Sequence, residues 1–307
     1  MNQNSKIALS FDVEDWYHTP AITGSSFSFY RSVDDFFENW KGEYDCLSDG
    51  FHYLIDLLKK HDVRATFFIV ADVMDRYPEV VRALKNSNHE IACHSLHHTS
   101  AIDAKTKKPF QAMDVWEKEL ILAKQKIETV FGMKATGYRA PNAYFGKWMV
   151  KLLERNGFLY DSSIAYNSMY NKTDVSLKNV PSVPYRMNAG DLSNVNADST
   201  IVELPWSYLK TGPFYLPGGG AFFYRALGNS YFNILLSQCL KMGDTMFYIH
   251  PLDFSNTDIP LSNNMARPMY WINKGYKTRK MFEKFIIRHK EKFATCRDVY
   301  SRFISLN

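Results

Sequence analysis

The chain has 307 residues, of which 46% are hydrophobic and 22% are charged, and its formal net charge is +5. This length suits one large domain or two small ones, and the composition is that of a globular protein with a sizeable core. No long basic block indicates nucleic-acid binding, and no apolar run approaches the ~18 residues of a membrane-spanning helix. Weak attraction to an anionic partner or to a membrane surface is compatible with the modest positive charge.

The first residues and the cysteines bear on location. The stretch "MNQNSKIALSFD" lacks the basic start and the long apolar core of a secretory signal. The cysteines are widely scattered without a Cys-x-x-Cys pair, and we expect free thiols at Cys46, Cys93, Cys239 and Cys296. These features predict a cytoplasmic protein and leave association with the inner face of the membrane open.

Stretches typical of strands and of helices alternate along the chain. In chain order, strands are predicted at 6–11, 64–70, 89–95, 135–141 and 245–251, and helices at 51–63, 78–88, 113–132, 147–157 and 279–293. Residues 166–230 are rich in Asn, Ser, Pro and Gly and are expected to be irregular. We therefore predict one catalytic domain over residues 1–307 with an irregular inserted segment, rather than two domains.

The alternation favours a parallel sheet, and a closed barrel is plausible at this length. Active sites of such barrels lie at the carboxyl ends of the strands. Ionisable side chains stand at four of these predicted strand ends, namely Asp12, His94, Arg139 and His250. This is the strongest organisational signal in the sequence, and it predicts one site at that end of the sheet.

The stretch "CHSLHH" (93–98) contains a candidate metal-binding pair. His94 and His98 are four residues apart, so on a helical turn they would share a face and could chelate one ion. His97 would point elsewhere. A lone histidine is usually structural, but two at this spacing after a strand favour a metal.

The acids in "ALSFDVED" (8–15) could complete such a site. If this stretch is extended, Asp12 and Glu14 lie on the face opposite the apolar side chains of the same strand. Two histidines and one carboxylate leave an open position for water in a catalytic zinc site. One acid could bind the metal while the other accepts a proton. Alternatively, the acids cap a helix or pair with arginines.

Two further strand ends carry polar candidates. Arg139 could hold a carboxylate through two hydrogen bonds. His250 could act as the general acid for a leaving group near a metal. The alternative for His250 is a core histidine whose ring is satisfied by its neighbours.

The stretch "LPGGGAFFYR" (216–225) places three glycines before aromatic residues. It lacks the Gly-x-x-x-x-Gly-Lys spacing of a phosphate loop. Either a flexible loop that lets the backbone approach a sugar or an ordinary tight loop fits this pattern. Aromatic side chains could stack on sugar faces or belong to the core, and the candidates are Trp16, Tyr17, Trp206 and Phe223.

The ordered set of motifs resembles the polysaccharide deacetylase family, which comprises the carbohydrate esterases of family 4 with a NodB-homology domain. "SFDVED" stands where the family has Thr-Phe-Asp-Asp-Gly, and "HSLHHT" (94–99) resembles His-Ser/Thr-x-x-His-Pro. "TFFIV" (66–70), "RAP" (139–141) and "YIH" (248–250) are similar to later elements of the family. "YDSSI", "ELPWS", "LPGGGAFFYR" and "HPLDF" resemble a branch with a longer C-terminal part.

The resemblance covers roughly residues 6 to 300 and implies a distorted (β/α)7-type barrel, that is, an α/β protein of the NodB-homology fold. It also implies a divalent metal, usually zinc, and removal of an N-acetyl group from an amino sugar. By position, it implies a base at Asp12, metal ligands at His94 and His98, a base-orienting Arg139, an acid at His250 and an acid-positioning Asp161.

The first motif departs from the family pattern, because Asp-Val-Glu-Asp replaces the adjacent aspartates. The metal carboxylate is therefore Glu14 or Asp15. Strand alternation and an Asp-x-Asp pattern in some relatives favour Glu14, whereas the family's preference for aspartate favours Asp15. Thr99 replaces the usual proline, and we expect no chemical consequence.

Three functions are compatible with these features. The first is metal-dependent deacetylation of an amino sugar in a glycan or glycan precursor. The second is hydrolysis of another carbon–nitrogen bond, in a small cyclic amide, and the third is catalytically silent carbohydrate binding. The complete set of ionisable residues counts against a catalytically silent protein. The expected location favours an intermediate of surface-glycan synthesis, including a lipid-linked one, as the carbohydrate partner.

Overall fold

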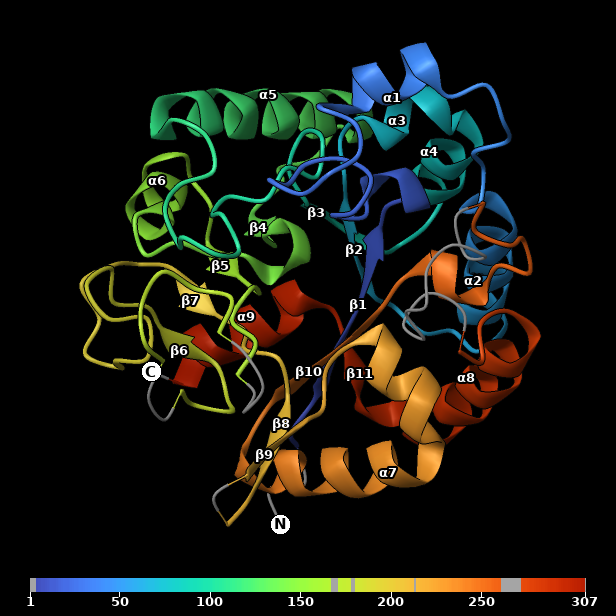
Figure 1. Ribbon diagram of the computed structural model, residues 1–307. Helices are drawn as coiled ribbons and strands as arrows, with labels where there is room; N and C mark the ends of the chain where they lie inside the picture. The colour runs from blue at the N-terminus through green and yellow to red at the C-terminus, as the bar shows by residue number, and fades with distance from the viewer. Residues whose placement is uncertain (1–3, 167–170, 178–179, 213, 261–271, 307) are drawn as a thin grey trace.

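A curled, mostly parallel sheet organises the protein (Figure 1). The computed structural model describes residues 4–166, 171–177, 180–212, 214–260 and 272–306. The strand order is β10-β1-β2-β3-β4-β5-β7-β6, and β11 also pairs with β1. The strands are β1 (Ile7–Val13), β2 (Thr66–Ile69), β3 (Glu90–Cys93), β4 (Gly137–Tyr138), β5 (Tyr160–Asp161), β6 (Tyr185–Arg186), β7 (Val202–Glu203), β10 (Thr245–Ile249) and β11 (Phe293–Ala294).

The sheet is a distorted barrel that stays open. The pairs that run from β10 through β1 to β7 are all parallel, whereas β6 is antiparallel to β7. In the described part of the chain, β6 and β10 stand at opposite ends of the strand order and do not pair. The predicted distorted α/β barrel is thus confirmed, and its sheet is not closed.

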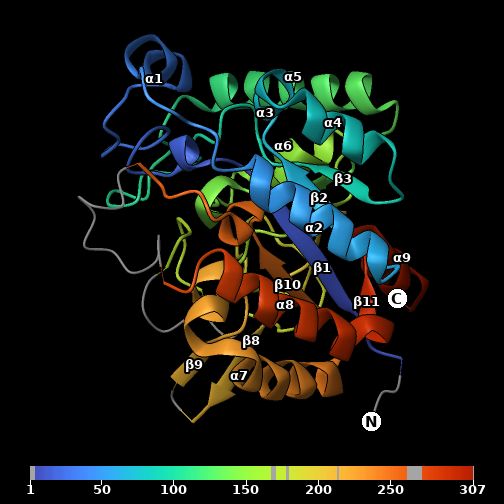
Figure 2. The same ribbon diagram turned by 90° about the vertical axis from the view of Figure 1, so that its right-hand side faces the viewer.

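Helices surround this sheet, mostly on its outside, and α9 packs against its inner face (Figures 1 and 2). They are α1 (Val33–Asn39), α2 (Ser48–Lys60), α3 (Val73–Arg76), α4 (Pro78–Lys85), α5 (Met113–Phe131), α6 (Met149–Arg155), α7 (Ala221–Met242), α8 (Tyr276–His289) and α9 (Cys296–Leu306). The five predicted helices are confirmed to within a few residues, and Gly132 ends α5 in the left-handed conformation with φ 66°. Helices α1, α3, α7 and α9 were not predicted.

The two faces of β1 separate an outer from an inner core. Its side chains Ile7, Leu9, Phe11 and Val13 pack in the large cluster beneath the helices. On the other face, Ala8 joins a smaller cluster with residues of neighbouring strands and of α9. The predicted alternation along β1 is therefore confirmed, and it directs Asp12 away from the helix layer.

The segment 166–230 is more ordered than the sequence indicates. Strand β7 joins the main sheet beside β5, β8 (Tyr208–Thr211) and β9 (Phe214–Pro217) form a hairpin, and α7 begins within the segment. The expectation of an irregular segment is therefore wrong for these parts, because the apolar side chains of Val202 and Leu204 fill the inner core. Residues 167–170, 178–179 and 213 of this segment lie outside the described residues.

Strands on either side of this segment share one sheet. Strands β10 and β11, which follow it, both pair with β1. The single-domain organisation remains a prediction. All four cysteines are free, as expected, and all four are buried. Among the described residues, we find no helix with the length and apolar character needed to cross a membrane.

Candidate active site

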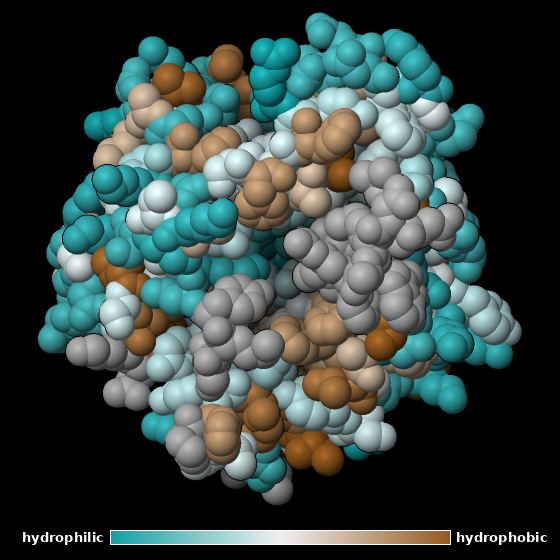
Figure 3. All heavy atoms as spheres, viewed as in Figure 1, coloured by the Kyte–Doolittle hydropathy of each residue, from teal (hydrophilic) through white to brown (hydrophobic). Residues whose placement is uncertain are grey.

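A cavity of about 330 Å³ opens at the carboxyl end of β1. Its floor carries Asp12, Glu14, His94, His98 and His250, and its walls include Tyr144, Lys172, Trp206, Phe222, Tyr248 and Leu252. In the space-filling view, apolar side chains gather around the middle of the face, whereas the edges are largely hydrophilic (Figure 3). Three of the four predicted strand-end residues, Asp12, His94 and His250, thus line one pocket, and Arg139 is buried in contact with Asp12.

Three ligand-type side chains converge on the pocket floor. Glu14, His94 and His98 each offer one atom within 4.8 Å of the others, and all three are buried. The Nε2 atoms of His94 and His98 lie 3.2 Å apart, and Oε2 of Glu14 contacts Nε2 of His98. This is a two-histidine, one-carboxylate set, as in catalytic zinc sites.

Backbone carbonyls determine how the two histidines face this point. Nδ1 of His94 donates to the carbonyl of Arg139 at 2.8 Å, and Nδ1 of His98 donates to the carbonyl of His18 at 2.8 Å. A carbonyl only accepts hydrogen bonds, so both neutral rings direct an Nε2 lone pair at the same point. Two facing lone pairs repel unless a cation lies between them. The residues present therefore fit a divalent metal.

Electrostatics favour the metal-binding protonation states of His94 and Glu14, whereas the neighbouring Glu14 raises the pKa of His98 despite its burial. Burial lowers the pKa of His94 to about 4, which keeps its imidazole neutral. Burial alone would raise the pKa of Glu14, but the neighbouring His98, His250 and His94 hold it well below its usual value. A neutral histidine and an ionised carboxylate are the forms that bind metal ions.

The histidine pair is not held by a helical turn. Residues 94–98 form a loop in which Ser95 and His98 adopt left-handed backbone angles, with φ 74° and 59°. The hydroxyl of Ser95 accepts a hydrogen bond from the backbone N–H of His98 at 2.9 Å. The prediction that both histidines face one point is correct, but a strained loop achieves it rather than helical spacing.

Asp15 points away from the three candidate metal ligands, Glu14, His94 and His98. Its carboxylate accepts hydrogen bonds from the backbone N–H of Trp16 at 2.6 Å, from that of Cys46 at 2.9 Å and from the Tyr77 hydroxyl at 2.5 Å. Burial raises the pKa of Asp15 to about 7. Of the two acids left open by the sequence, the geometry brings Glu14 to the histidines, whereas Asp15 caps the turn η1 (Trp16–His18).

Sequence reasoning missed a polar layer beneath the histidines. His18 accepts at Nδ1 from the backbone N–H of Asp15 at 3.0 Å, and its Nε2 lies 2.9 Å from Asp72. The other carboxylate oxygen of Asp72 lies 3.1 Å from Nδ1 of His97. The carbonyl of His18 accepts a hydrogen bond from Nδ1 of His98, so this layer supports one of the candidate metal ligands. His97 points away from the pocket floor, as predicted, but Asp72 had no local sequence signal.

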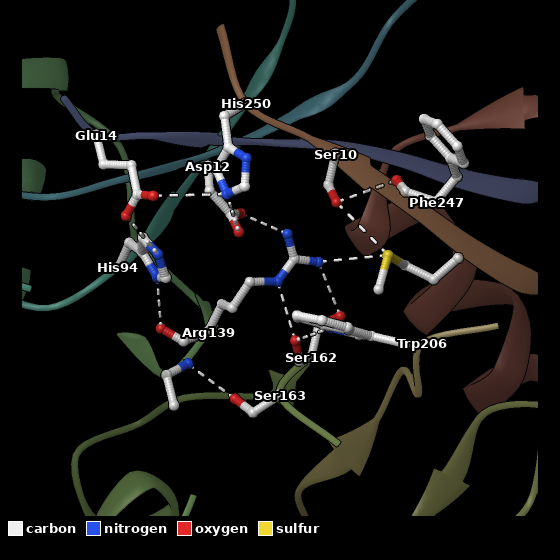
Figure 4. A network of polar contacts seen from close by, with 12 residues as sticks. Ser10, Asp12, Glu14, His94, Arg139, Ser162, Ser163, Trp206, Phe247 and His250 are labelled. Atoms are coloured by element: carbon white, nitrogen blue, oxygen red, sulfur yellow. Dashed lines mark hydrogen bonds and ion pairs between the residues drawn. The ribbon is translucent and has the colours of Figure 1, made fainter. Parts of the chain in front are cut away.

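Arg139 lies buried between Asp12 and the neighbouring strand end (Figure 4). Its Nη1 donates to Oδ1 of Asp12 at 2.5 Å, while Nε and Nη2 donate to the carbonyl and hydroxyl of Ser162 at 2.9 and 3.0 Å. The predicted contact between Arg139 and a carboxylate is present, through one hydrogen bond rather than two. It leaves Oδ2 of Asp12 on the side of His250, whose Nε2 is 3.9 Å away.

His250 is positioned by a different acid from the one predicted. Its Nδ1 lies 3.0 Å from Oδ2 of Asp253, and its Nε2 lies 3.5 Å from Oε1 of Glu14. Burial opposes protonation, but Asp253, Glu14 and Asp12 together raise the pKa of His250 to about 9. The positioning role predicted for Asp161 is thus corrected to Asp253.

Asp161 faces away from the pocket because its carboxylate accepts hydrogen bonds from the backbone N–H and the hydroxyl of Ser163 at 3.0 and 2.7 Å. Burial raises its pKa to about 6, beside a second buried acid, Glu203. The signal for Asp253 was available in "HPLDF". Pro251 opens a short turn, η3 (Pro251–Phe254), and the acid three residues after His250 caps it.

The aromatic candidates divide between core and pocket. Trp16 and Tyr17 are fully buried in a core cluster, so the sugar-stacking interpretation is wrong for both. Trp206 lines the pocket with its ring centroid 4.0 Å from that of Tyr248. The pocket wall is formed by Phe222 rather than Phe223. The three glycines pack tightly, since a Cβ at Gly218 would lie 2.8 Å from a backbone oxygen, which favours the tight-loop alternative.

Solved structures share this fold. A crystal structure of a Mycobacterium smegmatis protein assigned as a polysaccharide deacetylase matches with a TM-score of 0.63 at 18% identity, covering 99% of this chain and 92% of that one. PuuE allantoinase matches with a TM-score of 0.57 at 16% identity, covering 99% and 92%. At such identities the likeness shows the fold alone. It places the protein in the class of distorted α/β barrels.

Sequence comparison then gives the family. The family model described as polysaccharide deacetylase matches residues 37–160, and a model described as a domain of unknown function (DUF3473) matches residues 168–301. A peptidoglycan deacetylase-like protein of Gibberella zeae is 32% identical over 151 residues, which are 44% of this chain and 43% of that protein. The chain spans about two-fifths of the length of the curated relatives that it matches. These matches support a polysaccharide deacetylase with a C-terminal extension.

Proposed function

We propose that the protein is a metal-dependent N-deacetylase that removes an acetyl group from an amino sugar of a glycan or glycan precursor. The observation that carries this proposal is the convergence of Glu14, His94 and His98 beside Asp12 and His250 in one pocket. The match to the polysaccharide deacetylase model supports hydrolysis of an N-acetyl group, and the Gibberella relative is named as peptidoglycan deacetylase-like.

Glu14, His94 and His98 would hold the divalent metal, which we propose to be zinc. Such an ion supplies a Lewis acid for the acyl carbonyl and lowers the pKa of water. The three residues contribute orientation, since two backbone carbonyls fix the imidazole rings. One of these carbonyls belongs to Arg139. The same residue therefore orients His94 through its backbone and holds Asp12 through its side chain.

Asp12 and His250 would handle the protons of the reaction. Arg139 occupies Oδ1 of Asp12, so Oδ2 is the atom available to accept a proton from the attacking water. His250, with Nδ1 committed to Asp253, presents Nε2 to the pocket and can donate a proton to the departing amine. The base and the acid thus stand side by side, with 3.9 Å between Oδ2 and Nε2.

Substitution of Asp12 by Asn tests the proton acceptor. We expect kcat for deacetylation to fall by about 10²- to 10⁴-fold, the usual contribution of a general base. Metal content should remain unchanged, because Asp12 is not among the three converging ligands. Acetate release and elemental analysis of the same preparation measure both quantities. Deacetylation at the wild-type rate by Asp12→Asn would contradict the assignment.

A second candidate is hydrolysis of a small cyclic amide. It is favoured by the shared fold with PuuE allantoinase, a likeness that extends over 99% of this chain. Ring opening of a cyclic amide releases no acetate, so acetate release separates the two reactions. A screen of nucleotide-linked, lipid-linked and polymeric N-acetylated amino sugars would also identify the carrier. Saccharide binding without turnover of any of these compounds would instead indicate a silent relative.

A further inference from the structure

A buried ion pair between Arg225 and Asp253 supports His250, the proposed general acid of the pocket. Oδ2 of Asp253 accepts from the backbone N–H of His250 at 2.9 Å and lies 3.0 Å from its Nδ1. Oδ1 of the same carboxylate lies 2.8 Å from Nε of Arg225. Both Asp253 and Arg225 are buried. One carboxylate therefore joins the imidazole to a guanidinium.

The three residues come from separate elements of the C-terminal part. Arg225 lies on α7, His250 follows β10, and Asp253 lies in η3. Nη1 of Arg225 also donates to the carbonyl of Ile272 at 2.6 Å, which anchors the guanidinium from a second side. All of these residues fall within the region matched by the domain of unknown function.

This geometry restricts the imidazole more than a single hydrogen bond would. The carboxylate of Asp253 could rotate about its side-chain bonds if only His250 held it. Arg225 fixes the second oxygen, and the charge of the guanidinium keeps the carboxylate ionised, since the pKa of Asp253 lies below its usual value despite burial. A fixed carboxylate at Nδ1 determines which ring nitrogen faces the pocket.

We propose that Arg225 is a positioning residue for the reaction: through Asp253 it holds Nε2 of His250 where the departing amine takes up its proton. This inference rests on the proposed deacetylase function. It also assigns a role to the C-terminal extension, which supplies the acid side of a site whose histidine ligands lie in the region matched by the deacetylase model.

The leaving group gives a sharp test of this role. When the carbon–nitrogen bond breaks, its electron pair stays on nitrogen, and nitrogen must receive a proton because an amide anion is a very poor leaving group. In p-nitrophenyl acetate, the electron pair of the broken carbon–oxygen bond stays on a stable phenolate, which needs no proton. The ester therefore requires the base and metal ligands but not the acid.

The experiment compares Arg225→Gln and Asp253→Asn with the wild type on both substrates. We expect kcat on an N-acetylated amino sugar to fall by about 10²-fold, the lower end of a general-acid contribution. Hydrolysis of p-nitrophenyl acetate should change by less than about threefold, because its leaving group needs no acid catalysis. Arg225→Lys, which keeps the charge, should recover part of the loss. Equal losses on amide and ester would overturn the proposal.

A matched control separates positioning from folding. Asn229 lies on the same helix, donates to the carbonyl of Met281 at 2.8 Å and accepts from the hydroxyl of Tyr224 at 2.6 Å, and neither of these contacts involves Asp253. Asn229→Ala should lower thermal stability yet leave the amide-to-ester rate ratio unchanged, whereas a changed ratio would overturn the specific role of Arg225. A wild-type protein that releases no acetate from any amino sugar would instead refute the proposed function itself.

Discussion

At the scale of single residues, neighbouring acids on one short stretch have separate tasks. Asp12 meets Arg139, Glu14 meets the two histidines, and Asp15 is enclosed by backbone N–H groups and a tyrosine hydroxyl. Strand β1 ends at Val13, but Asp15 is still extended, with φ −115° and ψ 173°, so strand alternation correctly directs Glu14 to the histidines and Asp15 away from them.

This division predicts opposite behaviour for two isosteric substitutions. Glu14→Gln should reduce metal content strongly, because it removes the charged ligand. Asp15→Asn should retain the metal but lower the free energy of unfolding by about 1–3 kcal/mol, since one buried hydrogen bond loses its acceptor. Elemental analysis and urea denaturation provide the two readouts. Metal loss in Asp15→Asn with full occupancy in Glu14→Gln would reverse the assignment.

At the scale of elements, helix α2 packs directly on the turn that carries Asp253. Gly50 makes this approach possible, because a Cβ there would lie 2.0 Å from the carbonyl oxygen of Pro251 and 2.8 Å from the backbone nitrogen of Ser255. Both neighbours are backbone atoms and cannot rotate away. Any side chain at this position must therefore displace η3 or the helix.

Gly50→Ala should consequently affect both stability and chemistry. We expect the free energy of unfolding to fall by about 1–3 kcal/mol, as for other overpacked interiors. Amide hydrolysis should decline while metal content stays constant, because η3 holds the acid and not the metal ligands. Urea denaturation, acetate release and elemental analysis measure these effects. His52→Ala, at an exposed position of the same helix, is the matched control and should change none of them.

Local sequence patterns correctly predicted the structural features that depend only on neighbouring residues. The alternation along β1, the helix end at Gly132 and the polar strand ends were all readable, because each depends on residues adjacent in sequence. Helix α7 was missed because Gly228, with φ 71°, interrupts it and its residues show little contrast between polar and apolar faces. Asp253 was also readable, because it caps the turn in "HPLDF". Asp72 was not, because it meets His18 across the fold, which spacing does not encode.

At the scale of the whole molecule, buried histidines make stability depend on pH. Nε2 of His289 lies 2.8 Å from Oδ1 of Asn233, joining α8 to α7, and burial together with Arg288 lowers its pKa to about 4. The ordinary value in an unfolded chain is about 6.5. Between these values the unfolded chain binds more protons, so stability falls as pH decreases through this window.

His289→Gln should therefore flatten the pH dependence of unfolding. In the wild type, the free energy of unfolding should decrease by up to about 3 kcal/mol between pH ~6.5 and ~4 through this residue. Urea denaturation at several pH values measures the slope. An unchanged slope in His289→Gln would contradict the assignment.

The central place of β1 has a consequence for synthesis of the protein. One edge of β1 pairs with β2 soon after it is made, but the other pairs with β10, residues Thr245–Ile249. At ribosomal rates of about 5–20 residues per second, that edge waits on the order of tens of seconds for its partner. An unpaired strand edge invites pairing with other chains. The nascent protein therefore passes through an aggregation-prone stage in which chaperones would protect an exposed β1.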